Sequence, residues 1–136
     1  MTGYRYSLTA LLALALSGPA VRAADEALLA AGKRSFAKCQ LCHTIEADGP
    51  NRIGPNLYGM FARPPASAPG FRYSAAMKAK AGGGLVWDDA TLDAYIASPK
   101  AIVPGGSMAF AGIAKADERA ALLAYLKSVL GSADGN

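Results

Sequence analysis

The chain has 136 residues, a formal net charge of +4 and a hydrophobic fraction of 52%. This length suits one small domain behind a targeting segment. Without the two arginines of that targeting segment, the charge falls to +2, which is too weak to indicate a nucleic-acid-binding protein on its own. No apolar run reaches the roughly 20 residues that a membrane span requires.

The N-terminus is typical of a secretory signal. Arg5 precedes the apolar run LTALLALAL at residues 8–16, and small residues end at Ala23, where cleavage is expected. A membrane anchor is the alternative, but the apolar run is too short for it. We therefore expect a cleaved leader at residues 1–23 and a single mature domain at residues 24–136. The leader contains two arginines, so the mature charge would be +2 and the protein would be exported to the periplasm.

Helical periodicity and capping residues predict an all-α domain of four to five helices with long loops, because no segment shows the alternation of a strand. Gly32, in the first helix, costs about 1 kcal/mol relative to alanine, so another helix is expected to cross closely there. Residues 46–70 contain four glycines and five prolines and are predicted to form a loop. The predicted N-caps of the helices are Asp25, Ser74, Asp88 and Asp117.

The segment CQLCH, residues 39–43, contains both cysteines of the chain and its only histidine. A thioredoxin-like dithiol places C-x-x-C after a strand, and no strand is predicted before Cys39. A structural zinc site needs four protein ligands, but no Cys or His remains elsewhere in the mature chain. C-x-x-C-H is also the signature of covalent haem attachment. We therefore expect Cys39 and Cys42 to bond one haem c and His43 to bind its iron.

The second axial ligand of the iron is expected to be a methionine, because the chain has no second histidine. Methionine most often fills gaps in a core, and this reading suits Met77, which lies in a predicted helix. Met60 is close to His43 in sequence. Met108 lies in the glycine-rich loop PGGSM, which can carry a side chain back across a cofactor to its far face. Met108 is therefore the expected iron ligand.

Ordered motifs along the mature chain resemble those of class I cytochromes c, of the mitochondrial and bacterial cytochrome c2 type. They extend from Gly32 to Leu130 and include Trp87. The motifs are GKRSFAKCQLCH, GPNLYGMFAR, APGFRYS, TLDAYIASPKAIVPGGSMAFAGI and ERAALLAYLK. The resemblance implies a small helical fold wrapped around one covalently bound haem, with His43 and Met108 as the axial ligands.

The resemblance also implies roles for residues outside the C-x-x-C-H motif. The carbonyl of Pro55 would accept a hydrogen bond from His43 and fix its ring. Ordinary core packing is the alternative for the aromatic residues, and solvent exposure is the alternative for the arginine. The residues matching the family's groups around the haem propionates are Arg63, Tyr73 and Trp87; Tyr95 matches the tyrosine beside the methionine sulfur, and Phe110 the aromatic residue at the haem edge.

The chain departs from the family pattern at several positions. Gly106 and Ser107 stand where many members have a threonine and a lysine before the distal methionine. Asn51 stands where mitochondrial members have a histidine, and Met77 where an asparagine is frequent. Because of Gly106 and Ser107, the chain lacks a threonine hydroxyl expected near a propionate and a lysine expected to face a partner.

The implied function is one-electron transfer, because His/Met ligation would close both axial positions of the iron to substrates. We expect a monomeric periplasmic electron carrier that is not an enzyme, binds no nucleic acid and is not stably inserted in a membrane. Its expected partners are an electron donor and an electron acceptor with acidic faces, since Lys38, Lys100 and Lys115 match family positions around the exposed haem edge. The alternatives are a haem enzyme or gas sensor with Met108 off the iron, and a haem subunit of a larger complex.

Overall fold

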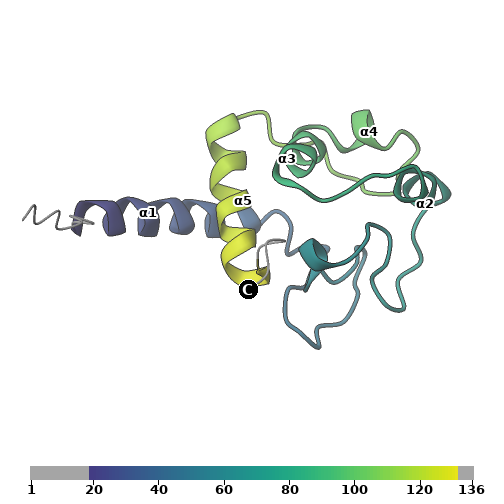
Figure 1. The fold of residues 1–136 in the computed structure, drawn as a ribbon, viewed down its shortest axis with the longest axis horizontal. Coiled ribbons are helices and arrows are strands. Elements are labelled where there is room, and N and C mark those ends of the chain that lie inside the picture. Colours follow the sequence, from purple (N-terminus) through teal and green to yellow (C-terminus); the bar gives the residue numbers. More distant parts are fainter. Residues whose placement is uncertain (1–18, 132–136) are drawn as a thin grey trace, which may run out of the picture.

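The computed structural model describes residues 19–131, so most of the expected leader lies outside the described residues. The described part contains five α-helices and a short 3-10 helix, with no strand, which confirms the all-α prediction (Figure 1). None of the helices within these residues combines the length and apolarity needed to cross a membrane. The elements are α1 (Pro19–Phe36), η1 (Met60–Ala62), α2 (Ala75–Gly82), α3 (Asp89–Ala97), α4 (Pro99–Ile102) and α5 (Ala116–Leu130).

Helices α1 and α5 cross near the C-terminal end of α1, while α2, α3 and α4 lie together on the other side of α5 (Figure 1). A Cβ atom placed on Gly32 would lie 2.0 Å from the carbonyl oxygen of Ala121 and 2.6 Å from the Cβ of Tyr125. Beside this contact, the rings of Phe36 and Tyr125 pack with their centroids 5.6 Å apart. The close crossing predicted from Gly32 is therefore present, and only glycine fits it.

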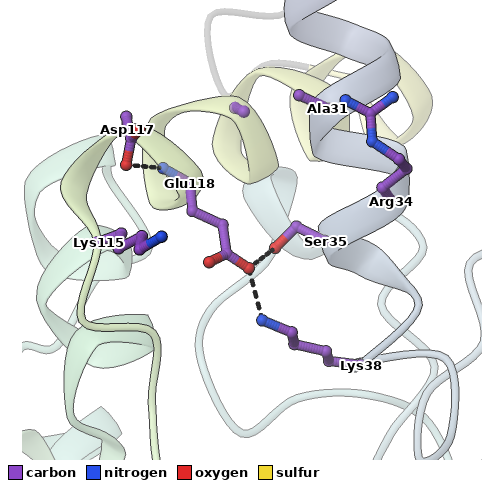
Figure 2. A pocket seen from close by; sticks show the side chains of 8 residues that line it. Ala31, Arg34, Ser35, Lys38, Lys115, Asp117 and Glu118 are labelled. Carbon is purple, nitrogen blue, oxygen red and sulfur yellow. Dashed lines mark hydrogen bonds and ion pairs between the residues drawn. The ribbon is translucent and has the colours of Figure 1, made fainter.

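A polar groove of about 380 Å³ opens where the end of α1 meets the start of α5 (Figure 2). Within it, the Glu118 carboxylate accepts hydrogen bonds from Lys38 Nζ at 2.6 Å and from Ser35 Oγ at 2.9 Å. These bonds lower the pKa of the Glu118 carboxyl. Ser35 is only 5% exposed, so its hydroxyl needs this partner. Glu118 thus ties the start of α5 to the residues directly before the C-x-x-C-H motif.

Two predicted N-caps are confirmed. Ser74 Oγ accepts a hydrogen bond from Met77 N at 3.2 Å, and Asp88 Oδ1 accepts one from Thr91 N at 2.7 Å. They start α2 and α3 by satisfying N–H groups that lack a partner in the first helical turn. The sequence prediction missed α4, a single turn that begins at Pro99, whose fixed φ suits the first helical position.

The other two predicted N-caps are wrong. Asp25 lies inside α1, because the helix extends back to Pro19 through an alanine-rich segment that favours helix. Asp117 lies in the first turn of α5, whose N-cap is Lys115. There the Asp117 carboxylate accepts a hydrogen bond from Glu118 N at 2.9 Å, and its charge favours the positive end of the helix dipole.

The apolar interior is divided into two clusters. The first surrounds the α1–α5 crossing and contains Phe36 and Leu122, which is 0% exposed. The second lies among α2, α3 and α4, and its buried residues are Met77, Tyr95 and Val103. Trp87 packs against both clusters. The interior is therefore joined across its middle by a side chain that is itself only half-buried.

We predict that Gly32→Ala lowers the thermal stability of the protein, because the new methyl group would push α1 and α5 apart. The expected cost is about 1–3 kcal/mol of unfolding free energy, as for other overpacked cores. Gly82→Ala is the matched control, since it also lies in a helix but a Cβ there meets no atom within 4 Å. Thermal unfolding followed by circular dichroism should show a lower midpoint for the first variant alone; equal midpoints would contradict the close crossing.

Candidate functional site

The C-x-x-C-H motif follows α1 directly and forms a compact turn. Cys39 N donates to Phe36 O at 2.8 Å, and Cys39 O accepts from Cys42 N at 3.0 Å and from His43 N at 2.9 Å. Both cysteines are half-buried free thiols, whereas Leu41 between them is 73% exposed. The two sulfurs and the imidazole are thus carried by one short, hydrogen-bonded turn whose position is set by the end of α1.

The His43 ring is held in one tautomer by the loop that follows. Its Nδ1 lies 2.8 Å from the carbonyl oxygen of Pro55. A carbonyl can only accept, so Nδ1 must carry the proton and Nε2 has the free lone pair. Burial lowers the pKa of His43, although the Pro55 hydrogen bond opposes this. The site therefore presents a neutral imidazole with one nitrogen available to a metal.

Gly54 completes the seat of this ring, a role that the sequence reasoning missed. A Cβ atom on Gly54 would lie 2.3 Å from His43 Cε1 and 2.7 Å from Nδ1. Its backbone N–H donates to the Cys42 carbonyl at 2.9 Å, so the loop is bonded to the motif at this point. The sequence did carry a signal for this role, the glycine directly before Pro55. Pro55 supplies the acceptor for the His43 ring, and the residue before it lies against that ring, where a side chain has no room.

Two asparagines give the loop after His43 a fixed shape. Asn56 Nδ2 donates to the carbonyls of Glu46 at 2.8 Å and Gly49 at 2.7 Å. Asn51 Oδ1 accepts from Asn56 N at 2.8 Å, and Asn51 Nδ2 donates to Pro69 O at 2.9 Å. Asn51, at the position where mitochondrial family members have a histidine, therefore links two distant parts of the loop. These bonds replace the regular structure that the glycines and prolines exclude.

Arg63 and Tyr73, the first two expected propionate partners, are both tied into the same loop region. Arg63 Nη2 donates to Asn56 O at 3.0 Å and Nη1 to Ser67 Oγ at 3.3 Å. Tyr73 Oη accepts from Ala68 N at 3.2 Å. Arg63 is therefore half-buried rather than freely solvated, and it reaches the residue that follows Pro55. The roles of both residues toward a propionate stay predictions.

The remaining expected residues border the two apolar clusters. Trp87 and Tyr95 pack together with ring centroids 5.0 Å apart, and burial raises the pKa of Tyr95. Met108 packs against this second cluster. Cys39 and Phe110 pack against the first cluster. The candidate haem residues thus come from both clusters, and all of them except the buried Tyr95 are only partly covered by protein.

These surroundings fit a covalently held haem better than the alternatives. Burial raises the pKa of the Cys39 thiol to about 11, a change that Lys38 opposes and Cys42 favours. A redox-active dithiol instead requires a lowered thiol pKa. Among residues 19–131, no three His, Cys, Asp or Glu side chains are grouped as metal ligands, and zinc would need four. A flat apolar ligand would cover the half-buried aromatic and sulfur groups, while the free His43 nitrogen suits iron.

The sequence model of the family described as cytochrome c matches residues 29–130. The chain belongs to the cytochrome c family. It is 44% identical over 101 residues to cytochrome c2 of Afifella marina, covering 74% of this chain and 82% of that one. It is 46% identical over 100 residues to cytochrome c of Chlamydomonas reinhardtii, covering 73% and 87% of the two chains. A cytochrome c homolog of Bradyrhizobium diazoefficiens is 46% identical over 118 residues, covering 86% of this chain and 62% of its own length.

Membership in this family means that the cytochrome carries one covalently bound haem c and acts in electron transport. The C-x-x-C-H motif supplies the two cysteines for that bond. The resemblance of the sequence motifs to class I cytochromes c of the c2 type is thereby confirmed. The fold, the cofactor and the electron-carrier class are established at this level.

We predict that Gly54→Ala disturbs the His43 ring, because the added methyl group would occupy the space of its Cε1 atom. The ring must turn or the loop must move, which weakens the hydrogen bond to Pro55. Proton NMR of the oxidised cytochrome should show shifted signals from the His43 ring. The melting temperature should also fall, because the unfolding free energy should decrease by about 1–3 kcal/mol. Gly82→Ala should change neither; ring signals of Gly54→Ala identical to those of the unmutated protein would refute the seat.

Proposed function

We propose that this cytochrome c is a periplasmic one-electron carrier whose haem iron is bound by His43 and Met108. The observation that carries the proposal is the hydrogen bond that His43 Nδ1 donates to the Pro55 carbonyl oxygen at 2.8 Å. This arrangement leaves Nε2 as the one ring nitrogen that is free to bind iron, and the hydrogen bond increases the basicity of the imidazole. Haem supplies reversible gain and loss of one electron, and a ring that cannot turn keeps the coordination the same in both states.

Burial distinguishes Met108 from the other two candidate methionines. Met60 is 6% exposed in the first cluster and Met77 is 9% exposed in the second, so both are core residues. Met108 is half-buried and lies in the loop that follows Gly105 and Gly106. A thioether that is not fully enclosed by protein is free to meet a ligand. This pattern supports Met108 as the second axial residue.

Two axial protein ligands would leave no open position on the iron, so electron transfer rather than an enzymatic reaction is the proposed activity. Trp87 and Met108 both pack against the cluster that contains Tyr95. The bulk of Trp87 and Tyr95 would keep water from the distal side, and a dry, apolar surrounding raises the reduction potential of a haem. We further propose that the cytochrome works as a monomer.

Export is proposed from the sequence of the leader, with cleavage after Ala23. Residues 20–28 at the start of α1 are all exposed. Removal of residues up to 23 would therefore uncover no buried side chain, and the crossing at Gly32 would be left intact. The mature domain would comprise residues 24–136. The mass of the protein purified from the periplasm tests this proposal, since only the cleaved form should be recovered there.

We predict that Met108→Ala keeps the haem attached but abolishes the weak red absorption band that reports a methionine–iron bond. The reduction potential should fall, and carbon monoxide should bind the reduced protein rapidly, because the sixth position is then open. Met60→Ala and Met77→Ala are the controls and should keep the band at lower thermal stability. If the unmutated protein lacks the band and binds carbon monoxide rapidly, an enzyme or sensor replaces the carrier.

The proposed partners are an electron donor and an acceptor with acidic faces. Lys100 and Lys115 are exposed, but Lys38 is paired with Glu118, which reduces the positive charge beside the motif. We predict that electron transfer to an acidic redox protein slows as salt increases. Because of the Lys38 pair and Ser107, the dependence should be shallower than for a lysine-rich cytochrome c measured in parallel by stopped flow. Rates that do not respond to salt would exclude an electrostatic role for these lysines.

A further inference from the structure

The backbone of the loop that carries Met108, residues 103–115, is hydrogen-bonded at its two ends, while Met108 and Phe110 between them pack against the two apolar clusters. At the first end, Val103 is 1% exposed, and its N–H donates to Pro99 O at 2.9 Å. Gly106 N then donates to Val103 O at 2.9 Å. Within the described part of the chain, residues 107–111 form no backbone hydrogen bond. The position of Met108 therefore depends on how firmly each end of this free stretch is held.

The second anchor lies where the loop passes the end of α3. Ile113 is 3% exposed and its N–H donates to Ile96 O at 3.0 Å. Directly before it, Gly112 has a φ of 103°, and a Cβ atom there would lie 2.1 Å from Ala97 O. The backbone thus runs against α3 at this point. Beyond it, the carbonyls of Ile113 and Ala114 still need donors.

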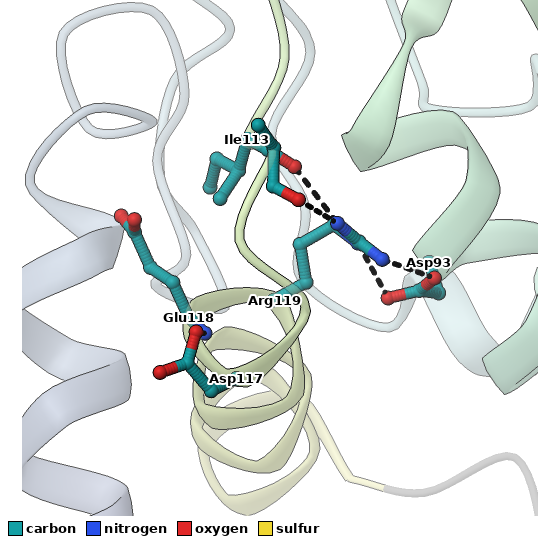
Figure 3. Close-up of polar contacts among 6 residues, drawn as sticks. Asp93, Ile113, Asp117, Glu118 and Arg119 are labelled. Atoms are coloured by element: carbon teal, nitrogen blue, oxygen red, sulfur yellow. Dashed lines mark hydrogen bonds and ion pairs between the residues drawn. The ribbon is translucent and has the colours of Figure 1, made fainter.

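Arg119 of α5 supplies those donors (Figure 3). Its Nη1 donates to Ile113 O at 3.0 Å and to Ala114 O at 2.9 Å. The other side of the guanidinium donates to Asp93 of α3, with Nε 2.8 Å from Oδ1 and Nη2 3.2 Å from Oδ2. The Arg119 side chain is only 14% exposed. One planar group therefore joins α5, α3 and the end of the Met108 loop.

We propose that Arg119 is a positioning residue for Met108, and that its fork between Asp93 and the two loop carbonyls keeps the methionine at the haem iron. The inference rests on the proposed His43/Met108 ligation. Without the Arg119 bonds, the bond from Ile113 N to Ile96 O is, within residues 19–131, the one backbone hydrogen bond left at this end of the stretch. The end of the loop should then open more often, and a loop that is less firmly held has more conformations to lose when the thioether meets the iron. Methionine dissociation should then become more frequent while the helices stay folded.

Arg119→Lys separates this role from a simple ion pair. Lysine keeps the positive charge for Asp93, but its point-like ammonium cannot also reproduce the planar fork to Ile113 O and Ala114 O. Lys127→Gln is the matched control, because Lys127 of α5 pairs with Asp89 of α3. This pair joins the same two helices without touching the loop. Both variants thus weaken α3–α5 contacts, but only Arg119→Lys also removes bonds to the end of the Met108 loop.

The test uses the oxidised holoproteins with cyanide as the probe, since cyanide can bind the iron only after the methionine leaves. Arg119→Lys should bind cyanide about tenfold faster, the change expected from losing a hydrogen bond to a charged donor. Its red methionine–iron band should also disappear at a lower temperature than in the unmutated protein. Lys127→Gln should stay within about twofold of the unmutated rate, as for an exposed ion pair. Circular dichroism measures helix unfolding in parallel.

Asp93→Asn is the second variant and decides the matter if Arg119→Lys does not accumulate. It keeps the guanidinium but removes the charged partner that orients it, so cyanide binding should again be faster than in Lys127→Gln. If the variants that fold match Lys127→Gln in cyanide binding rate and in the stability of the red band, the role of Arg119 is wrong. The proposed His43/Met108 ligation would not be affected by that result. An unmutated spectrum without a Met108-dependent band would overturn the ligation and, with it, this inference.

Discussion

The contact of α1 with α5 at Gly32 is the constraint on which the haem-binding segment depends. The helices meet backbone to backbone, since a side chain at Gly32 would overlap the Ala121 carbonyl. Such an approach fixes the distance between the two helices, and the packing of Phe36 against Tyr125 fixes how far along each helix the other one crosses. Cys39 follows directly after this helix, and Glu118 bonds to Ser35 and Lys38 at the same junction. The attachment turn is therefore placed by a rigid helix pair.

The loop after the motif fixes the orientation of the His43 ring. This loop is rich in glycine and proline and forms little regular structure. Backbone hydrogen bonds of helices therefore cannot compensate the conformational entropy that the loop loses on folding. Side-chain amides of Asn51 and Asn56 bind carbonyls across the loop, and Gly54 lies against the His43 ring. The Pro55 carbonyl is thus held where it selects the tautomer. A backbone group, rather than a charged side chain, orients the imidazole.

The two-part interior explains why one domain can hold a large prosthetic group. The first cluster is organised by the long helices, and the second by α2, α3 and α4. Trp87 joins them, while several apolar side chains at their borders remain half-buried. A cofactor that covers these surfaces would add burial that a small chain cannot obtain from its own residues. Arg119 connects α3 of this second region to α5 and to the end of the Met108 loop.

Local chemistry explains which features were readable from the sequence. The caps Ser74 and Asp88 bond to N–H groups three residues away, and C-x-x-C-H is a contiguous motif, so both could be recognised without a fold. Gly32 could be read as a crossing because a glycine in a helix is unfavourable unless its missing side chain matters. The expected cap at Asp117 was wrong because α5 begins at Ala116, one residue before it, so that Asp117 lies in the first turn and Lys115 is the N-cap.

The sequence by itself determined the helical class, the covalent haem and the family, since these rest on short-range patterns and ordered motifs. Only the tertiary structure showed that Gly54 lies against His43, that Asn51 joins the loop to Pro69, and that Arg119 connects Asp93 to the Ile113 carbonyl. Each of these contacts joins backbone or side-chain atoms whose proximity depends on how the whole chain is folded. Hydrogen bonds to backbone carbonyls leave no residue-type signal at the acceptor, because every residue has a carbonyl. The orientation of His43, of the loop beside it and of Arg119 was therefore decided by the fold.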